Sequence, residues 1–206
     1  MTETPGKDKH EPPAVELKDP VLAAFLAWLV PGLGHLYQRR LGKAALFFIC
    51  IMSTFIYGLY LGGSEELGWG RAVYASWRDS DKRLPFLCQI GIGLPAMPAL
   101  VQANRVRKGR PPLWNGFMAP PSLARGGFDK AGQPKAHGGF DESGQVTVNK
   151  LYYDLNRLFE LGTVYTMIAG LLNILAIYDA WGGPVFIETE RKDDEEESQE
   201  TEDRDI

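Results

Sequence analysis

Residues 20–43 read PVLAAFLAWLVPGLGHLYQRRLGK, and this stretch indicates how the rest of the chain is organised. An uncharged run leads into Pro31 and Gly32, a basic turn follows at residues 39–43, and a second apolar run begins at once. Proline kinks or ends a helix, and glycine lets the backbone bend. Two structures fit the first run: a kinked helix that spans a membrane, or a helix that breaks and turns back.

Four windows of 18 residues carry almost no charge, namely 20–37, 44–61, 84–101 and 161–178. A helix of that length spans about 27 Å, close to the thickness of the hydrocarbon layer. The alternative, four buried helices of a soluble bundle, would show a polar stripe along each helix, and the second window has hardly one. We therefore expect an all-α membrane protein with about four transmembrane helices.

The segments outside these windows define the domain organisation. A polar tail covers residues 1–19, a helical membrane domain covers 20–187, and an acidic tail covers 188–206. Both tails lack the apolar residues that a core needs, so we expect them to be disordered. The third window holds Pro95 and Pro98, which favour a bent helix.

The soluble loop 104–157 contains an internal repeat of the pattern F-D-x-x-G-Q at 128–133 and 140–145. Its Asp and Gly are placed for tight turns, so short turns or hairpins are expected. Residues 148–178 indicate one long helix that begins near Asn149. In residues 62–83, three aromatic residues at roughly helical spacing predict a short amphipathic helix at the membrane surface; they are Trp69, Tyr74 and Trp77.

Three polar side chains fall inside the apolar windows and are candidate intramembrane contacts: His35, Gln89 and Asn173. We expect Asn173 to face the bundle interior, because lipid would leave its amide without hydrogen bonds. His35 suits an interfacial residue bonded at a helix end, and the alternative is a proton relay or ligand. Gly58, and Gly162 with its small neighbours four residues apart, favour close helix packing.

Basic residues cluster beside the windows. Each can gain roughly 1 kcal/mol from an anionic membrane surface. The candidate lipid-headgroup contacts are Arg39, Arg40, Lys43, Arg105, Arg107, Lys108 and Arg110. Since basic residues near membrane ends favour the cytoplasmic side, we expect the turn 38–43 and the loop 104–157 to be cytoplasmic and both termini outside. A first run that turns back would instead bring the N-terminus inside with the basic turn.

Several functional classes find no support in the sequence. It contains no G-x-S-x-G, H-E-x-x-H or P-loop pattern, and Gly91-x-Gly93 lacks the strand of a dinucleotide site. Cys50 and Cys88 lie singly in apolar windows, which favours packing over metal or redox chemistry. The basic cluster is too small for a nucleic-acid interface. We expect no cofactor, no metal, no nucleic-acid partner and no enzymatic activity.

The hairpin resembles the two-transmembrane-segment domain of many bacterial membrane proteins. The residues that carry this resemblance are Pro31, Gly32, Leu33, Gly34, Tyr37, Arg40, Gly42 and Lys43. Together with residues 91–100 and 169–173, the chain is similar to an uncharacterised family of small bacterial multi-pass membrane proteins over most of 20–184. This resemblance implies a location in the bacterial cytoplasmic membrane and no particular activity.

Three functions stay open at this point. The first is a structural or interaction component of the membrane, with lipids, a second copy of the chain or other membrane proteins as partners. The second is a small transporter or channel component that uses the bent helix at Pro95 and Pro98 with Gln89 and Asn173. The third is a membrane-embedded enzyme that uses His35, and its partner would be Glu160 or Asp179.

Overall fold

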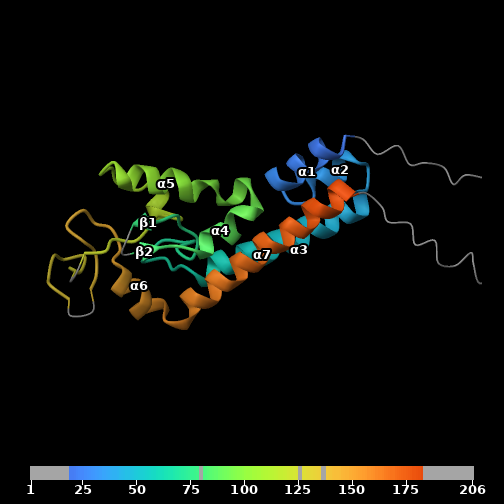
Figure 1. Cartoon of the computed structure of the whole chain (residues 1–206). Coiled ribbons are helices and arrows are strands. Elements are labelled where there is room, and N and C mark those ends of the chain that lie inside the picture. Colours follow the sequence, from blue (N-terminus) through green and yellow to red (C-terminus); the bar gives the residue numbers. More distant parts are fainter. Residues whose placement is uncertain (1–18, 79–80, 125–126, 136–137, 183–206) are drawn as a thin grey trace, which may run out of the picture.

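The computed structural model describes residues 19–78, 81–124, 127–135 and 138–182. This part of the chain is mostly helical (Figure 1). Two long helices, α3 (Leu41–Leu61) and α7 (Arg157–Gly182), run antiparallel along the molecule. The described parts of residues 62–83 and 108–156 lie together at one end and are called the head below. The two expected tails fall outside the described residues, apart from Asp19.

Two helices, α3 and α7, are long and apolar enough to cross a membrane. The apolar helix α1 (Pro20–Leu29) is shorter, at 10 residues. It extends for about 15 Å, half of the hydrocarbon layer. Four transmembrane helices are therefore not confirmed, since the windows 20–37 and 84–101 each form a broken helix.

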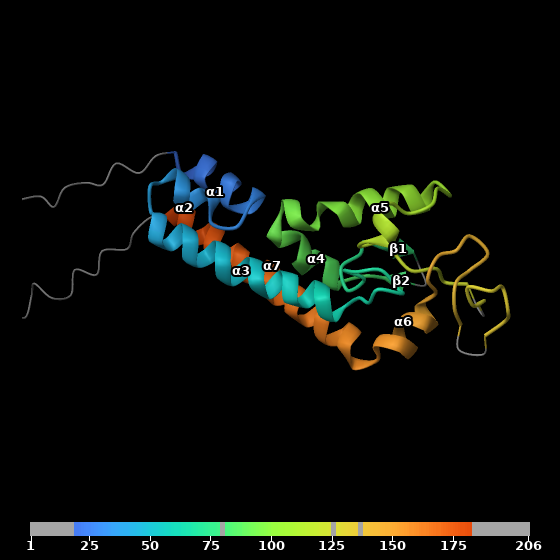
Figure 2. The ribbon, with the colours of Figure 1, turned by 180° about the vertical axis from the view of Figure 1, so that it is seen from behind.

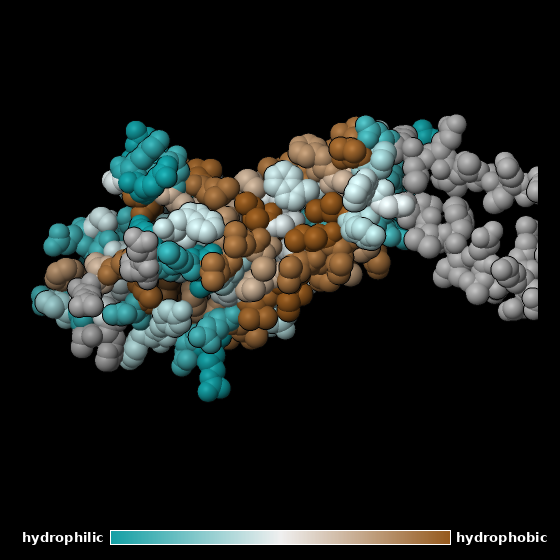
Figure 3. All heavy atoms as spheres, in the orientation of Figure 1, coloured by the Kyte–Doolittle hydropathy of each residue, from teal (hydrophilic) through white to brown (hydrophobic). Residues whose placement is uncertain are grey.

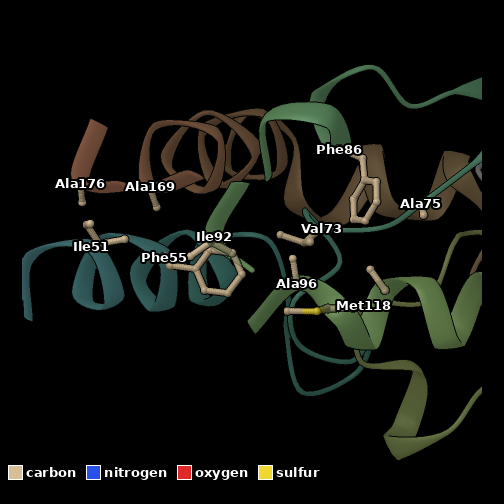
Figure 4. Packing of buried hydrophobic residues seen from close by; sticks show 11 residues of the cluster. Ile51, Phe55, Val73, Ala75, Phe86, Ile92, Ala96, Met118, Ala169 and Ala176 are labelled. Atoms are coloured by element: carbon tan, nitrogen blue, oxygen red, sulfur yellow. The ribbon is translucent and has the colours of Figure 1, made fainter. Parts of the chain in front are cut away.

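Glycines let α3 and α7 pack closely. A Cβ built at Gly58 would lie 2.7 Å from Thr166 Cγ2, and one at Gly162 would lie 2.6 Å from the carbonyl oxygen of Gly58. Figure 4 shows the side chain of Ile51 from α3 pointing toward Ala176 of α7, and that of Phe55 lying beside Ile92 in the same cluster. The predicted close packing at Gly58 and Gly162 is confirmed.

The first window breaks and turns back, which is one of the two structures that fit its sequence. Asp19 caps α1, since its Oδ1 accepts hydrogen bonds from the amides of Val21 and Leu22 at 3.0 and 3.3 Å. The helix ends before Pro31, and Gly32 takes a φ of +82° that L side chains rarely adopt. The short helix α2 (Leu33–Tyr37) then runs back beside α1.

The third window also breaks instead of bending. It forms α4 (Pro85–Gln89), the 3₁₀ turns η1 (Ile90–Ile92) and η2 (Leu94–Ala96), and α5 (Met97–Arg107). The break lies at Gly93, whose φ is +80° and where a Cβ would lie 1.8 Å from the carbonyl oxygen of Trp28. The prolines expected to bend a helix stand instead in the first turns of η2 and α5, where a missing N–H costs little.

Two further helix predictions are wrong. The described residues of 62–83 form no helix; they hold an antiparallel pair, β1 (Trp77–Arg78) and β2 (Asp81–Lys82), after glycine-rich turns. The expected single helix over 148–178 divides at Asn156, whose φ is +46°, into α6 (Val148–Leu155) and α7. A positive φ is uncommon for a residue other than glycine, and asparagine is among the residues enriched there. The cap of α6 is Thr147.

The repeat forms two matching turns, as its Asp and Gly predicted. Asp129 Oδ1 accepts hydrogen bonds from two amides at 2.8 Å, and Asp141 Oδ1 does the same at 2.9 and 2.8 Å. Gly132 and Gly144 share a φ of +77°. Phe128 and Phe140 exchange backbone hydrogen bonds of 2.9 Å, so the two copies pair with each other.

The substitution Gly162→Ala tests the close approach of α3 and α7. The new Cβ meets backbone atoms of α3, so we expect a loss of stability of about 1–3 kcal/mol. The matched control is Gly42→Ala in α3, where a Cβ meets nothing within 4 Å. Because alanine favours helix, this control should be neutral or stabilising by up to about 1 kcal/mol. Thermal unfolding in detergent measures both, and equal behaviour would contradict the packing.

Candidate functional site

The candidate site is the polar face that α7 turns toward the other helices. Thr163, Thr166 and Asn173 are buried along this face, and Asp179 follows near its end. Their partners come from the first hairpin, from α4 and η1, and from the start of α3. The long helix α7 therefore provides polar contacts to several of the shorter elements.

Asn173 lies at the point where the two broken helices meet. Its Nδ2 donates hydrogen bonds to the carbonyl oxygen of Ala27 in α1 at 3.1 Å and to that of Gly91 in η1 at 2.9 Å. Trp28 Nε1 also donates to the carbonyl oxygen of Ile90 at 3.3 Å. Carbonyls at a helix C-terminus lack partners within the helix, so these side chains supply them. We call this meeting point the joint; it places Asn173 in the interior, where its polarity predicted it.

Gln89 fixes the second broken helix to α7 on the side of the head. It is fully buried, and its Nε2 donates to Thr166 Oγ1 at 2.8 Å and to the carbonyl oxygen of Ala72 at 3.2 Å. Arg83 Nη2 makes a parallel contact, donating to Thr163 Oγ1 at 2.7 Å and to the same Ala72 oxygen at 3.1 Å. These contacts tie α7, α4 and the head into one unit.

A charged cluster closes the other end of α7. His35 Nε2 lies 2.7 Å from Asp179 Oδ2, Lys43 Nζ lies 3.1 Å from Asp179 Oδ1, and Arg40 Nη2 lies 3.6 Å from Asp179 Oδ2. The imidazole is fully buried and packs on Phe47 with ring centroids 4.8 Å apart. Its Nδ1 is enclosed and has no hydrogen-bond partner among the described residues. Since Nε2 is bonded to Asp179 and the ring is buried, the geometry suits a structural contact.

Of the two acidic partners considered for His35, the structure brings Asp179 to it. Glu160 lies near the opposite end of α7, about 28 Å away along the helix axis. The interpretation of His35 as a residue hydrogen-bonded at a helix end agrees with this geometry.

The basic residues form two groups at opposite ends of the bundle. Arg39, Arg40 and Lys43 lie at the end with Asp179. The second group, Arg105, Arg107, Lys108 and Arg110, lies at the end of α5 beside the head. The first window turns back, so Asp19, the basic turn and Gly182 share one end and the loop 104–157 lies at the other (Figure 2). The expectation that turn and loop lie on the same side of a membrane therefore does not fit this fold.

Two buried cations in the head, Arg71 and Lys150, were not among the residues that the sequence singled out. Arg71 is buried and donates to the carbonyl oxygens of Leu67 at 2.7 Å and Ala119 at 3.3 Å, and burial lowers its pKa to about 10. Lys150 contacts Glu66 at 3.1 Å and Asp154 at 2.8 Å. Burial acts to lower the pKa of Lys150, but these two carboxylates outweigh it and raise that pKa. The apolar run that follows Arg71 in the sequence could have indicated that this segment is buried.

A model of a family of unknown function, DUF6677, matches residues 22–193. The chain belongs to this family. The match covers both broken helices, the joint, the charged cluster and the head. No curated protein and no solved structure matches the chain.

The substitution Asn173→Leu tests the joint. It leaves the carbonyls of Ala27 and Gly91 without their donor in a buried place, so we expect a stability loss of about 1–2 kcal/mol. Leu175→Ala, two residues away on the exposed face of α7, is the control and should change stability by less than about 0.5 kcal/mol. Thermal unfolding in detergent compares them, and a neutral Asn173→Leu would show that the joint does not depend on this amide.

The substitution Asp179→Asn tests the charged cluster. It removes the negative charge that three basic side chains share, and we expect a stability loss of about 1–3 kcal/mol. Glu160→Gln removes the same charge from the far end of α7 and should stay within about 0.5 kcal/mol. The comparison is made at neutral pH by thermal unfolding. Equal effects of the two variants would mean that the cluster adds nothing specific.

Proposed function

We propose that the protein is an integral membrane protein without enzymatic activity, a structural or interaction component of the bacterial cytoplasmic membrane. One observation carries this proposal: the bundle exposes large apolar side chains on its outer surface and buries polar side chains such as Asn173 in its interior. On α3 and α7, Ile49 is 63% exposed and Leu175 is 65% exposed, whereas Asn173 is fully buried. Figure 3 shows hydrophobic residues over the bundle surface between the two polar ends of the molecule. Water would penalise this arrangement, and lipid favours it.

Aromatic residues at both ends of the bundle support a membrane location. Tyr60 stacks on Trp69 near the head, with ring centroids 5.4 Å apart. Tyr178 and Trp181 are exposed near the end of α7. Tyrosine and tryptophan favour the two membrane interfaces, and the helix between residues 161 and 181 covers about 30 Å, the thickness of the hydrocarbon layer.

In the proposed arrangement α3 and α7 cross the membrane, and the two broken helices enter it from opposite sides. Backbone that is not helical is tolerated at membrane depth only where protein or water covers it. The joint supplies this cover, since Asn173 and Trp28 occupy the carbonyls of Ala27, Gly91 and Ile90. Occupied carbonyls favour a structural joint over an ion or substrate path, so we place the transporter alternative second.

A structural role also fits the charged cluster and the head. His35 is enclosed, which favours a contact over a catalytic base. The two paired turns of the repeat lie in the head, away from the bundle (Figure 1). We propose that the bundle anchors the head at the membrane surface, where membrane lipids and other membrane proteins are its partners.

The substitution Ile49→Lys tests the membrane location. A charged side chain near the centre of a spanning helix costs about 2.5–3.5 kcal/mol of insertion free energy. We expect the variant to lose resistance to alkaline extraction from membranes, whereas the original chain stays in the membrane pellet. Trp114→Lys in the head, where the side chain is equally exposed, serves as the control and should be retained. An Ile49→Lys chain that behaves like the control would place the outer face of α3 in water.

A further inference from the structure

A cleft of about 460 Å³ lies between the β1 strand and α5, beside the place where the bundle meets the head. One wall comes from the strand region and the other from α5. Its lining residues are Ala75, Ser76, Trp77, Arg78, Leu100, Ala103, Asn104, Arg107 and Pro120. Neither the joint nor the charged cluster contributes to this cleft, so the contacts described above leave it unexplained.

Two guanidinium groups from separate elements line the cleft. Arg78 stands on β1, and Arg107 is the last residue of α5, where its Nη2 contacts Asn104 Oδ1 at 3.3 Å. No acidic side chain is among the described residues that line it. Asp81, the cross-strand neighbour of Arg78, is not among these lining residues; its Oδ1 accepts a hydrogen bond from the Tyr74 hydroxyl at 3.4 Å. The lining therefore has an excess of positive charge, which an anion would balance.

The wall of the cleft also holds Ser76, a serine whose hydroxyl lacks a hydrogen-bond partner among the described residues. Ser76 is 6% exposed, and its Oγ has no hydrogen-bond partner among the described residues. A buried hydroxyl without a hydrogen bond is costly. Two guanidinium groups, an amide and a hydroxyl together match the oxygens of a phosphate group, for which Arg is well suited.

The position of the cleft connects it to the membrane surface. The chain leaves the joint at Gly93, and α5 then runs toward the head. The residues of α5 change from apolar to basic along this direction. Leu100 in the wall is partly exposed, and Val101 beside it is 47% exposed on the same stretch of helix. A phosphate between the two arginines would thus have apolar surface next to it for an acyl chain.

We infer that this cleft binds a phosphate group, with an anionic phospholipid of the surrounding membrane as its source. The inference rests on the proposed membrane location. The phosphate lies between Arg78 and Arg107, the Ser76 hydroxyl donates to one of its oxygens, and the acyl chains lie along Leu100. Free phosphate offers the same oxygens without the chains, so the experiment separates the two sources.

The test uses the full chain in nanodiscs of phosphatidylcholine that contain a small fraction of labelled phosphatidylglycerol. Native mass spectrometry measures how much labelled lipid stays with the protein. We expect retention above the bulk fraction, and the double variant Arg78→Gln/Arg107→Gln should lower the affinity at least about tenfold. The double variant Lys130→Gln/Lys135→Gln loses the same charge outside the cleft and should change the affinity less than about threefold.

Three outcomes separate the explanations. Equal losses in the two double variants, or retention at the bulk fraction in the original chain, would overturn the inference. Displacement of the lipid by millimolar inorganic phosphate, absent in Arg78→Gln/Arg107→Gln, would keep the phosphate site and assign it to free phosphate. The variant Ser76→Ala, which removes only the hydroxyl, should weaken retention with no change in unfolding temperature. A protein that leaves the nanodisc altogether would count against the proposed membrane location and not against the cleft.

Discussion

The fold depends on one constraint: helices that end in the middle of an apolar bundle must find hydrogen bonds for their last carbonyls. α1 ends there, and so does η1. The side-chain amide of Asn173 donates a hydrogen bond to a carbonyl oxygen of each, and Trp28 adds a third hydrogen bond from α1 to η1. The two broken helices are thereby placed end to end along α7.

α7 serves as the common partner because its inner face alternates between small and polar residues. Gly162 and Gly170 bring α3 and α4 into close backbone contact, and a Cβ at Gly170 would lie 2.1 Å from the carbonyl oxygen of Cys88. Such close contact brings Thr166 and Asn173 within reach of backbone and side-chain partners on the other elements. Packing and hydrogen bonding therefore depend on the same helix spacing. A larger side chain at either glycine would increase both the distance between the helices and the hydrogen-bond distances.

The sequence predicted the two long helices, the close packing at glycines and the turns of the repeat, because each depends on residues near one another in the chain. It left open whether window 20–37 breaks, and it did not predict the break in window 84–101. Apolar content is the same for a straight helix and a broken one, and the break at Gly93 depends on its contact with Trp28, far away in sequence. For the same reason the cleft between Arg78 and Arg107 was out of reach. Asn173 was predictable because its polarity alone excludes the lipid face.

The break at Gly93 also decides where the charges of α5 lie. Had residues 84–107 formed one straight helix, it would have extended for about 36 Å and brought Arg107 to the end of the bundle opposite Arg78. Because the chain reverses at Gly93, α5 returns to the head, and Gln102 anchors it there through the carbonyl oxygens of Leu113 and Phe117 at 2.7 and 2.9 Å. The left-handed glycine that permits the joint therefore also brings two guanidinium groups to the two walls of one cleft. A substitution at Gly93 would disturb both places at once, although they lie at different depths of the molecule.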